Sequence, residues 1–256
     1  MTETLLSRIG YDFGAAARGI GRLLNNKEDT KAVFEIMRAL SGRSIPNGYA
    51  RLLRSAEGGR IAYDRVELQP ILDDHETLAK LPEGSVGRAY LAFVQGRKIS
   101  AEGLAEESRA TGDEIDSLHP FAWYGRRMRD VHDLWHVLSG YQTDALGEAC
   151  VVSFSFPQTR SLGFALIGFA AGRELQRLLP GRPVFKAVWQ AYQNGRKAAW
   201  LPVQHYERLL AEPLDAARKR LNISAPTYYL EIPASERDGI PANLKGGVGG
   251  GGSRPQ

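Results

Sequence analysis

His132, Asp133 and His136 lie within five consecutive residues, and Glu148 follows twelve positions after His136. Residues four positions apart share one face of a helix, so the imidazoles of His132 and His136 can reach the same cation. Asp133 borders that face and adds a carboxylate. Two neutral imidazoles with one or two carboxylates suit a divalent ion such as zinc, iron, manganese or cobalt, and ligand type alone does not choose among these metals. The spacing therefore predicts a metal site, with these four residues as the candidate metal ligands and catalytic residues.

Glu148 can join this site only if the chain reverses direction after His136. One straight helix would carry the glutamate far from the histidines. Residues 139–142 (Ser-Gly-Tyr-Gln) are typical of a helix end followed by a turn, and Thr143 or Asp144 can cap a second helix. We therefore expect Glu148 near the first turn of that second helix, folded back towards the histidines.

Two other interpretations use the same residues. Two histidines at this spacing also occur as ordinary core residues, although the added carboxylates favour the ligand interpretation. The His132-Asp133 doublet also resembles HD phosphohydrolases, which need a further upstream histidine and a distant downstream aspartate. The candidates for these two positions are His75 or His119 and Asp144 or Asp215. That arrangement leaves His136 and Glu148 without a role.

The pattern His-Asp-x-x-His-x11-Glu, formed by residues 132–148, resembles the signature of the coenzyme Q (ubiquinone) biosynthesis protein 4 family. Residues 81–90 (Leu-Pro-Glu-Gly-Ser-Val-Gly-Arg-Ala-Tyr) are similar to the family's Leu-Pro-x-Gly-(Ser/Thr)-x-Gly-x-x-Tyr segment. Residues 127–133 resemble its approach to the metal site, and residues 207–223 resemble its closing helix. The resemblance spans roughly residues 80 to 223.

This resemblance implies ubiquinone biosynthesis, with zinc favoured as the metal. The implied reaction is an oxidative decarboxylation that replaces the C1 carboxylate of a polyprenylated hydroxybenzoate by a hydroxyl group. The metal would stabilise negative charge on the ring. Arg129 is a candidate to orient the substrate carboxylate, or it pairs with Asp133 at i, i+4. The family is also associated with a complex of biosynthetic enzymes, so a non-catalytic lipid-binding scaffold is the alternative.

The elements that must position these residues are helices. Apolar residues recur at intervals of three and four, and no stretch alternates as a strand would. We predict an all-α fold: a single multi-helix domain over residues 1–223, an extended C-terminal arm over 224–245 packed on it, and a flexible glycine-rich tail over 246–256. The predicted helices cover residues 4–24, 29–41, 47–57, 73–80, 85–95, 101–108, 120–138, 144 to about 177, 183–199, 202–210 and 213–221.

Residues 149–172 are the most apolar part of the chain. Arg160 and the Pro-Gln-Thr sequence before it interrupt the apolar run, which is then too short to cross a membrane. The pattern predicts a buried helix pair, or one helix kinked at Pro157. Large apolar side chains after Glu148 could line a channel for an isoprenoid tail. The candidates, not all of which can face one way, are Phe154, Phe156, Leu162, Phe164 and Phe169, and we assign Phe156 and Phe164 to substrate binding.

Charge and cysteine content limit the classes of binding partner and the cellular compartment that we expect. Lys and Arg exceed Asp and Glu by 33 to 29, an excess too small and scattered for nucleic-acid binding but compatible with an anionic membrane surface. Cys150 is the only cysteine, so no intramolecular disulfide can form, and we expect it in the core. Glu3 and Asp12 count against a transit peptide. We expect a bacterial, cytoplasmic protein, peripheral to the inner membrane, whose partners are the polyprenylated ring intermediate, other ubiquinone biosynthetic enzymes and a second copy in a homodimer.

Overall fold

The computed structural model describes residues 10–25, 30–97 and 119–238. Every regular element in these ranges is a helix, apart from one isolated antiparallel bridge between Ser85 and Pro213. The all-α prediction is therefore confirmed. The described helices are, in chain order, α1 (Phe13–Asn25), α2 (Thr30–Ala39), α3 (Ser44–Leu52), α4 (Ala56–Asp64), α5 (Gln69–Asp73), α6 (His75–Ala79), α7 (Val86–Arg97), α9 (Pro120–Asp130), α10 (His132–Ser139), α11 (Ala145–Thr159), α12 (Leu162–Leu178), α13 (Val184–Lys197), the 3-10 helix η2 (Leu201–Val203), α14 (Tyr206–Leu209), α15 (Leu214–Arg220), α16 (Thr227–Leu230) and α17 (Ala234–Asp238).

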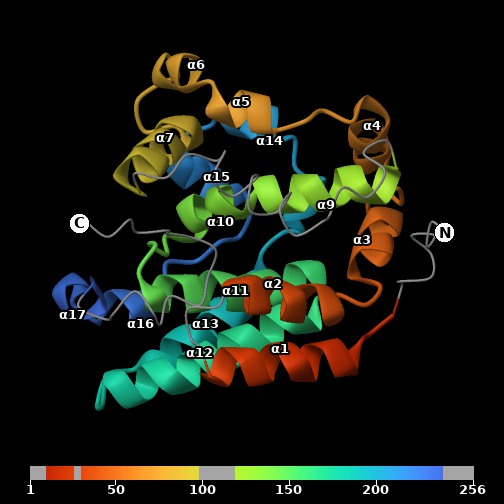
Figure 1. Ribbon diagram of the computed structural model, residues 1–256. Helices are drawn as coiled ribbons and strands as arrows, with labels where there is room; N and C mark the ends of the chain where they lie inside the picture. Colours follow the sequence, from red (N-terminus) through yellow and green to blue (C-terminus); the bar gives the residue numbers. More distant parts are fainter. Residues whose placement is uncertain (1–9, 26–29, 98–118, 239–256) are drawn as a thin grey trace, which may run out of the picture.

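Helix α11 runs through the middle of the molecule. It packs against α12 and α13 on one side, while α10 lies on the other side together with α7, α9 and α15 (Figure 1). Every residue from Ala145 to Ser155 is buried, including Cys150, as its sequence predicted. A helix that is apolar all round belongs in an interior. A β-carbon at Gly195 would lie 2.1 Å from the carbonyl oxygen of Phe154, so the α13 backbone rests directly on α11.

Several long predicted helices are interrupted. The segment 120–138 forms α9 and α10, which meet at Val131. The segment from 144 to 177 forms a helix pair and not one kinked helix, because α11 ends where Arg160 takes a left-handed conformation at φ 58°. Pro157 lies inside α11. The predicted helix 101–108 and the first residues of the predicted helix 4–24 lie outside the described residues.

The predicted C-terminal arm carries two short helices, α16 and α17, that the sequence pattern did not indicate. Tyr229 and Ile232 are fully buried, so this part of the chain packs on the helical body. The predicted tail at 246–256 lies outside the described residues. Within the described ranges, no helix combines the length and the hydrophobicity that a bilayer crossing requires.

Candidate metal centre

The end of α10 is held by backbone and side-chain contacts. Gly140 follows the helix at φ 81°, a left-handed conformation that glycine adopts without strain, and its amide donates to the carbonyl of His136 at 2.8 Å. Arg218, on α15, donates from Nε to the carbonyl of Leu138 at 3.0 Å and from Nη2 to that of Val137 at 2.9 Å. These bonds satisfy carbonyls that a helix end leaves free and suit its partial negative charge. The helix that carries both histidines therefore has a defined end.

The following turn brings Glu148 back to the histidines. Of the two predicted caps, Asp144 is the one observed: its Oδ1 accepts from the amide of Gly147 at 3.0 Å. A β-carbon at Gly147 would lie 2.0 Å from the carbonyl oxygen of Gln142, so this tight approach requires glycine. Glu148 lies in the first turn of α11, on a different helix from the histidines. The predicted turn after α10 and the predicted position of Glu148 on a second helix are therefore confirmed.

Three ligand atoms converge in the interior. Oε2 of Glu148 lies 3.4 Å from Nε2 of His136 and 3.7 Å from Nε2 of His132. All three atoms are shielded from solvent. Asp133 lies close to the same two histidines, since one ligand atom each from His132, Asp133 and His136 lie within 4.8 Å of one another. Either carboxylate can thus share the histidine pair.

The donor set fits a divalent cation. Two atoms bonded at about 2.0 to 2.2 Å to one tetrahedral ion lie about 3.3 to 3.6 Å apart. The separations of 3.4 and 3.7 Å between the glutamate oxygen and the imidazole nitrogens are close to that range. Imidazole and carboxylate donors suit the borderline metals, and they leave the choice among those metals open.

The orientation of His136 is set by its other ring nitrogen. Nδ1 lies 3.0 Å from the carbonyl oxygen of Tyr141. Because a carbonyl can only accept, Nδ1 carries a proton, and Nε2 is the ring nitrogen that faces Glu148 and is left to bind a metal. The ring of Phe93, on α7, packs on the imidazole with the ring centres 5.3 Å apart.

Electrostatics keep Glu148 ionised. Burial alone would raise the pKa of this carboxyl, but the nearby imidazoles of His136 and His132 together bring the pKa below its ordinary value. The carboxylate is therefore available as an anionic ligand.

The segment 81–90 positions α7 against the site. Its backbone pairs with the segment around Pro213: the amide of Val86 donates to the carbonyl of Glu212 at 2.9 Å, and that of Gly87 to Leu210 at 2.8 Å. Two of the segments that carry the family resemblance thus contact each other. The helix that starts there brings Phe93 to His136.

The predicted substrate residues lie in different surroundings. Arg129 binds Asp130, with Nη2 3.0 Å from Oδ1, so the carboxylate that it contacts is the neighbouring one and not the predicted Asp133. Phe156 stacks on Tyr192, and Phe164 packs against the main core. Phe154 is fully buried, whereas Phe169 is 61% exposed. A single channel lined by all five predicted apolar residues is therefore not formed.

The residues of the phosphohydrolase arrangement do not meet at the centre. His119 caps α9, where its Nδ1 accepts from the amide of Phe121, and His75 begins α6 at the surface. Asp215 is almost fully exposed, while Asp144 caps α11. His205 contacts Glu57 and Glu207.

Sequence patterns did not reveal three residues that support the ligands although they lie far from them in sequence. Arg218, Tyr229 and Phe93 belong to this group. The one available signal was their place in or near the segments that carry the family resemblance, and it did not indicate which side chain meets which helix.

Comparison with known proteins agrees with the resemblance. A family model described as "Coenzyme Q (ubiquinone) biosynthesis protein Coq4" matches residues 12–227. The chain is 32% identical to the mitochondrial ubiquinone biosynthesis protein COQ4 homologs of Rattus norvegicus, over 183 residues, and Homo sapiens, over 187 residues. Each match covers 71% of this chain and 66% of the relative, so the chain spans just under two thirds of the length of these relatives.

A solved structure shares the fold. It is the crystal structure of a Nostoc punctiforme protein proposed to be a ubiquinone biosynthesis protein, with a TM-score of 0.60 at 21% identity, covering 84% of this chain and 100% of that one. The family model spans most of the chain, including the histidines and Glu148. The chain belongs to the coenzyme Q (ubiquinone) biosynthesis protein Coq4 family.

Proposed function

We propose that this protein is a metal-dependent enzyme of ubiquinone biosynthesis. Its reaction is the oxidative decarboxylation of a polyprenylated hydroxybenzoate, in which the C1 carboxylate leaves as carbon dioxide, a hydroxyl group takes its place, and dioxygen serves as the two-electron oxidant. The observation that supports it best is the convergence of His132, His136 and Glu148, whose ligand atoms are shielded from solvent. Family membership supports the substrate class.

His132, His136 and Glu148 would hold the ion, with Asp133 as a fourth ligand or as a partner of a ligand. Zinc is favoured, with iron, manganese and cobalt as alternatives. A bound cation supplies positive charge that stabilises negative charge developing on the substrate ring. The chain itself contributes orientation, because the Tyr141 carbonyl fixes the His136 ring. It also limits water, because His136 and Glu148 are buried.

The proposed partners are the polyprenylated ring intermediate, the other enzymes of the pathway, a membrane surface and a second copy of the chain. We propose a peripheral position on the inner membrane, on the cytoplasmic face if the protein is bacterial. The relatives compared above carry mitochondrial names.

A non-catalytic scaffold is the second candidate. The observation that favours it is the exposure of large apolar side chains on α12, α13 and α16. Phe169 and Trp189 are each 61% exposed, and Leu230 is 60% exposed. A surface of this kind suits lipid or protein contact without any chemistry.

An experiment can distinguish the two functions if it removes a metal ligand and leaves the exposed apolar surface unchanged. His136→Ala and the matched surface variant His75→Ala are expressed in a host that lacks its own family member. We expect His75→Ala to restore ubiquinone, and His136→Ala to lose its metal and accumulate the ring that still bears its carboxylate. If the His136→Ala protein is folded, joins the complex and restores full ubiquinone synthesis, the enzyme interpretation is wrong and the scaffold interpretation replaces it.

A further inference from the structure

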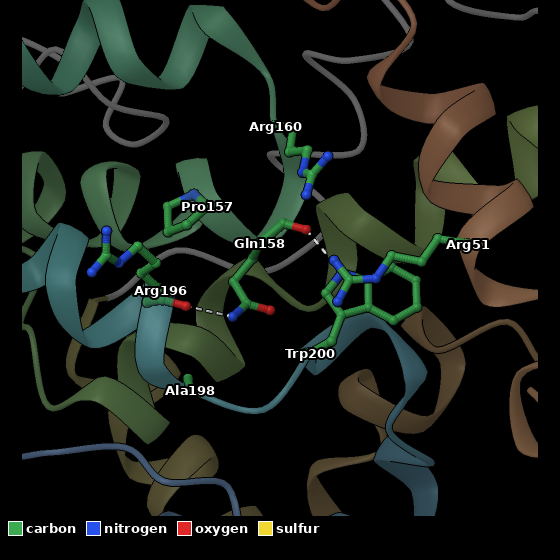
Figure 2. A pocket seen from close by; sticks show the side chains of 8 residues that line it. Arg51, Pro157, Gln158, Arg160, Arg196, Ala198 and Trp200 are labelled. Carbon is green, nitrogen blue, oxygen red and sulfur yellow. Dashed lines mark hydrogen bonds between the residues drawn. The ribbon is translucent and has the colours of Figure 1, made fainter. Parts of the chain in front are cut away.

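A hollow lies at the opposite end of α11 from the histidines. It has a volume of about 210 Å³, and its lining includes Arg51, Arg160 and Arg196. Figure 2 shows Arg51 and Arg160 on one side of Gln158, and Arg196 on the other side with its guanidinium directed away from theirs. Arg51 lies in the last turn of α3, Arg196 in the last turn of α13, and Arg160 directly after α11. A helix rises about 1.5 Å per residue, so the length of α11 places Arg160 about 18 Å from Glu148. The hollow is therefore separate from the metal centre.

Positive charge dominates the hollow. Its eight lining residues include three arginines and no aspartate or glutamate. Elsewhere arginines meet carboxylates, for example Arg126 with Glu67, but within the described ranges no ion pair involves the three that line the hollow. Burial lowers the pKa of Arg51, and the charge of Arg160 lowers it further. The guanidiniums of Arg51 and Arg160 therefore repel one another, and a bound anion would stabilise both.

The floor of the hollow is rigid. The buried Gln158 side chain donates to the carbonyl of Gly195 at 2.7 Å and accepts from the amide of Leu201 at 2.8 Å. The backbone carbonyl of Gln158 accepts from Nε1 of Trp200 at 2.9 Å (Figure 2). The guanidinium of Arg51 lies 4.3 Å from the centre of the Trp200 ring, within cation-π range. One charged group is thus held in place before any ligand arrives.

Arg160 occupies a position that usually belongs to glycine. Its φ of 58° is left-handed, a conformation that costs energy for a residue with a side chain. A cation is favourable at a helix end, but that alone does not explain three cations around one hollow. An observed strained residue is a reason to look for a use of its side chain, and this side chain lines the hollow.

We propose that Arg51 and Arg160 form a binding site for a phosphoryl group, with Arg196 at the opposite edge of the hollow. The planar fork of arginine matches phosphate oxygens, and charge-assisted hydrogen bonds of this kind are strong. A phosphoryl dianion balances the two charges of Arg51 and Arg160 better than a singly charged carboxylate does. The phosphoryl group belongs either to a soluble metabolite or to a lipid headgroup, which share this chemistry.

Calorimetric titration of the full chain with inorganic phosphate at constant ionic strength tests the site. We expect Arg160→Gly to weaken binding at least tenfold. Without phosphate its melting temperature should equal or exceed that of the wild type, because glycine tolerates the left-handed position. Arg196→Gln tests a second wall of the hollow. Arg173→Gln, on the exposed face of α12, is the matched control and should bind as the wild type does.

Two further ligands identify the source of the phosphoryl group. One is glycerol phosphate in the same titration, and the other is phosphatidylcholine vesicles with and without phosphatidic acid in a sedimentation assay. Binding that depends on Arg160 and Arg196 supports the site in either assay and names the source. Absence of binding in all assays, or binding that is equal in wild type, Arg160→Gly and Arg196→Gln, would overturn the proposal.

Discussion

The hydroxyl of Tyr229 donates a hydrogen bond to the carboxylate of Asp144, although 85 residues separate them in sequence. Nη1 of Arg237 lies 3.3 Å from the same carboxylate oxygen, and its guanidinium lies 3.9 Å from the centre of the Tyr229 ring. Asp144 caps the helix whose first turn carries Glu148. The C-terminal segment therefore holds the end of α11 that faces the histidines.

Tyr229→Phe removes this hydroxyl and keeps the ring. We expect the free energy of unfolding to fall by about 1 to 3 kcal/mol, because the buried carboxylate of Asp144 loses one of its donors. We also expect weaker metal binding, because the first turn of α11 is less firmly held. Tyr228→Phe, at the partly exposed neighbouring position, is the control. Chemical denaturation of both variants is the measurement, and equal stabilities would show that the hydroxyl does not secure the helix.

The turn before Glu148 makes a second prediction. A β-carbon at Gly147 would collide with the Gln142 carbonyl, whereas one at Gly125, in α9, would meet no atom within 4 Å. Gly147→Ala should therefore cost about 1 to 3 kcal/mol of stability and displace Glu148. Gly125→Ala should be neutral or stabilise by up to about 1 kcal/mol, because alanine favours helix. Thermal unfolding and metal content that do not differ between the two variants would contradict the predicted collision.

The parts of the site that local chemistry determines could be predicted from the sequence. A glycine after a helical run, followed by an aspartate that can cap, signals a helix end and a new start. This pattern predicted the helix end at Gly140, a cap at Thr143 or Asp144, and a separate helix for Glu148. The spacing of His132 and His136 predicted their shared face, because residues four apart lie on the same side of a helix.

Breaks within helices and contacts across the fold could not be predicted in this way. Proline removes only one hydrogen bond from a helix. Helix α11 packs against both α12 and α13 and continues past Pro157. The helix ends instead at Arg160, a residue type that gives no signal for a left-handed conformation. The bond from Tyr229 to Asp144 depends on how distant segments fold together, which no local pattern encodes.

The third prediction concerns Arg218, which binds the end of the helix that carries the histidines. Arg218→Met keeps much of the side-chain length and removes the donors to the Leu138 and Val137 carbonyls. We expect a loss of about 1.5 to 3 kcal/mol, the usual range for hydrogen bonds to a charged group. Lys219→Met, at an exposed position of the same helix, is the control for losing one positive charge. Denaturation curves that coincide for the two variants would exclude a capping role.

Glu148 makes the last prediction, on metal binding itself. Glu148→Gln keeps the shape of the side chain and removes the negative charge that the two imidazoles face. A ligand at 100 times its Kd stabilises the folded protein by about 2.7 kcal/mol, and a hundredfold weaker affinity reduces this gain to about 0.4 kcal/mol. We therefore expect zinc to raise the melting temperature of the wild type and of Glu231→Gln, an exposed control on the C-terminal segment, and to leave Glu148→Gln nearly unchanged. Equal zinc-induced shifts in all three proteins, together with equal zinc content by elemental analysis, would remove Glu148 from the ligand set. A shift that persists in Glu148→Gln but is lost in Asp133→Asn would assign the anionic ligand to Asp133, the other carboxylate within reach of the histidine pair.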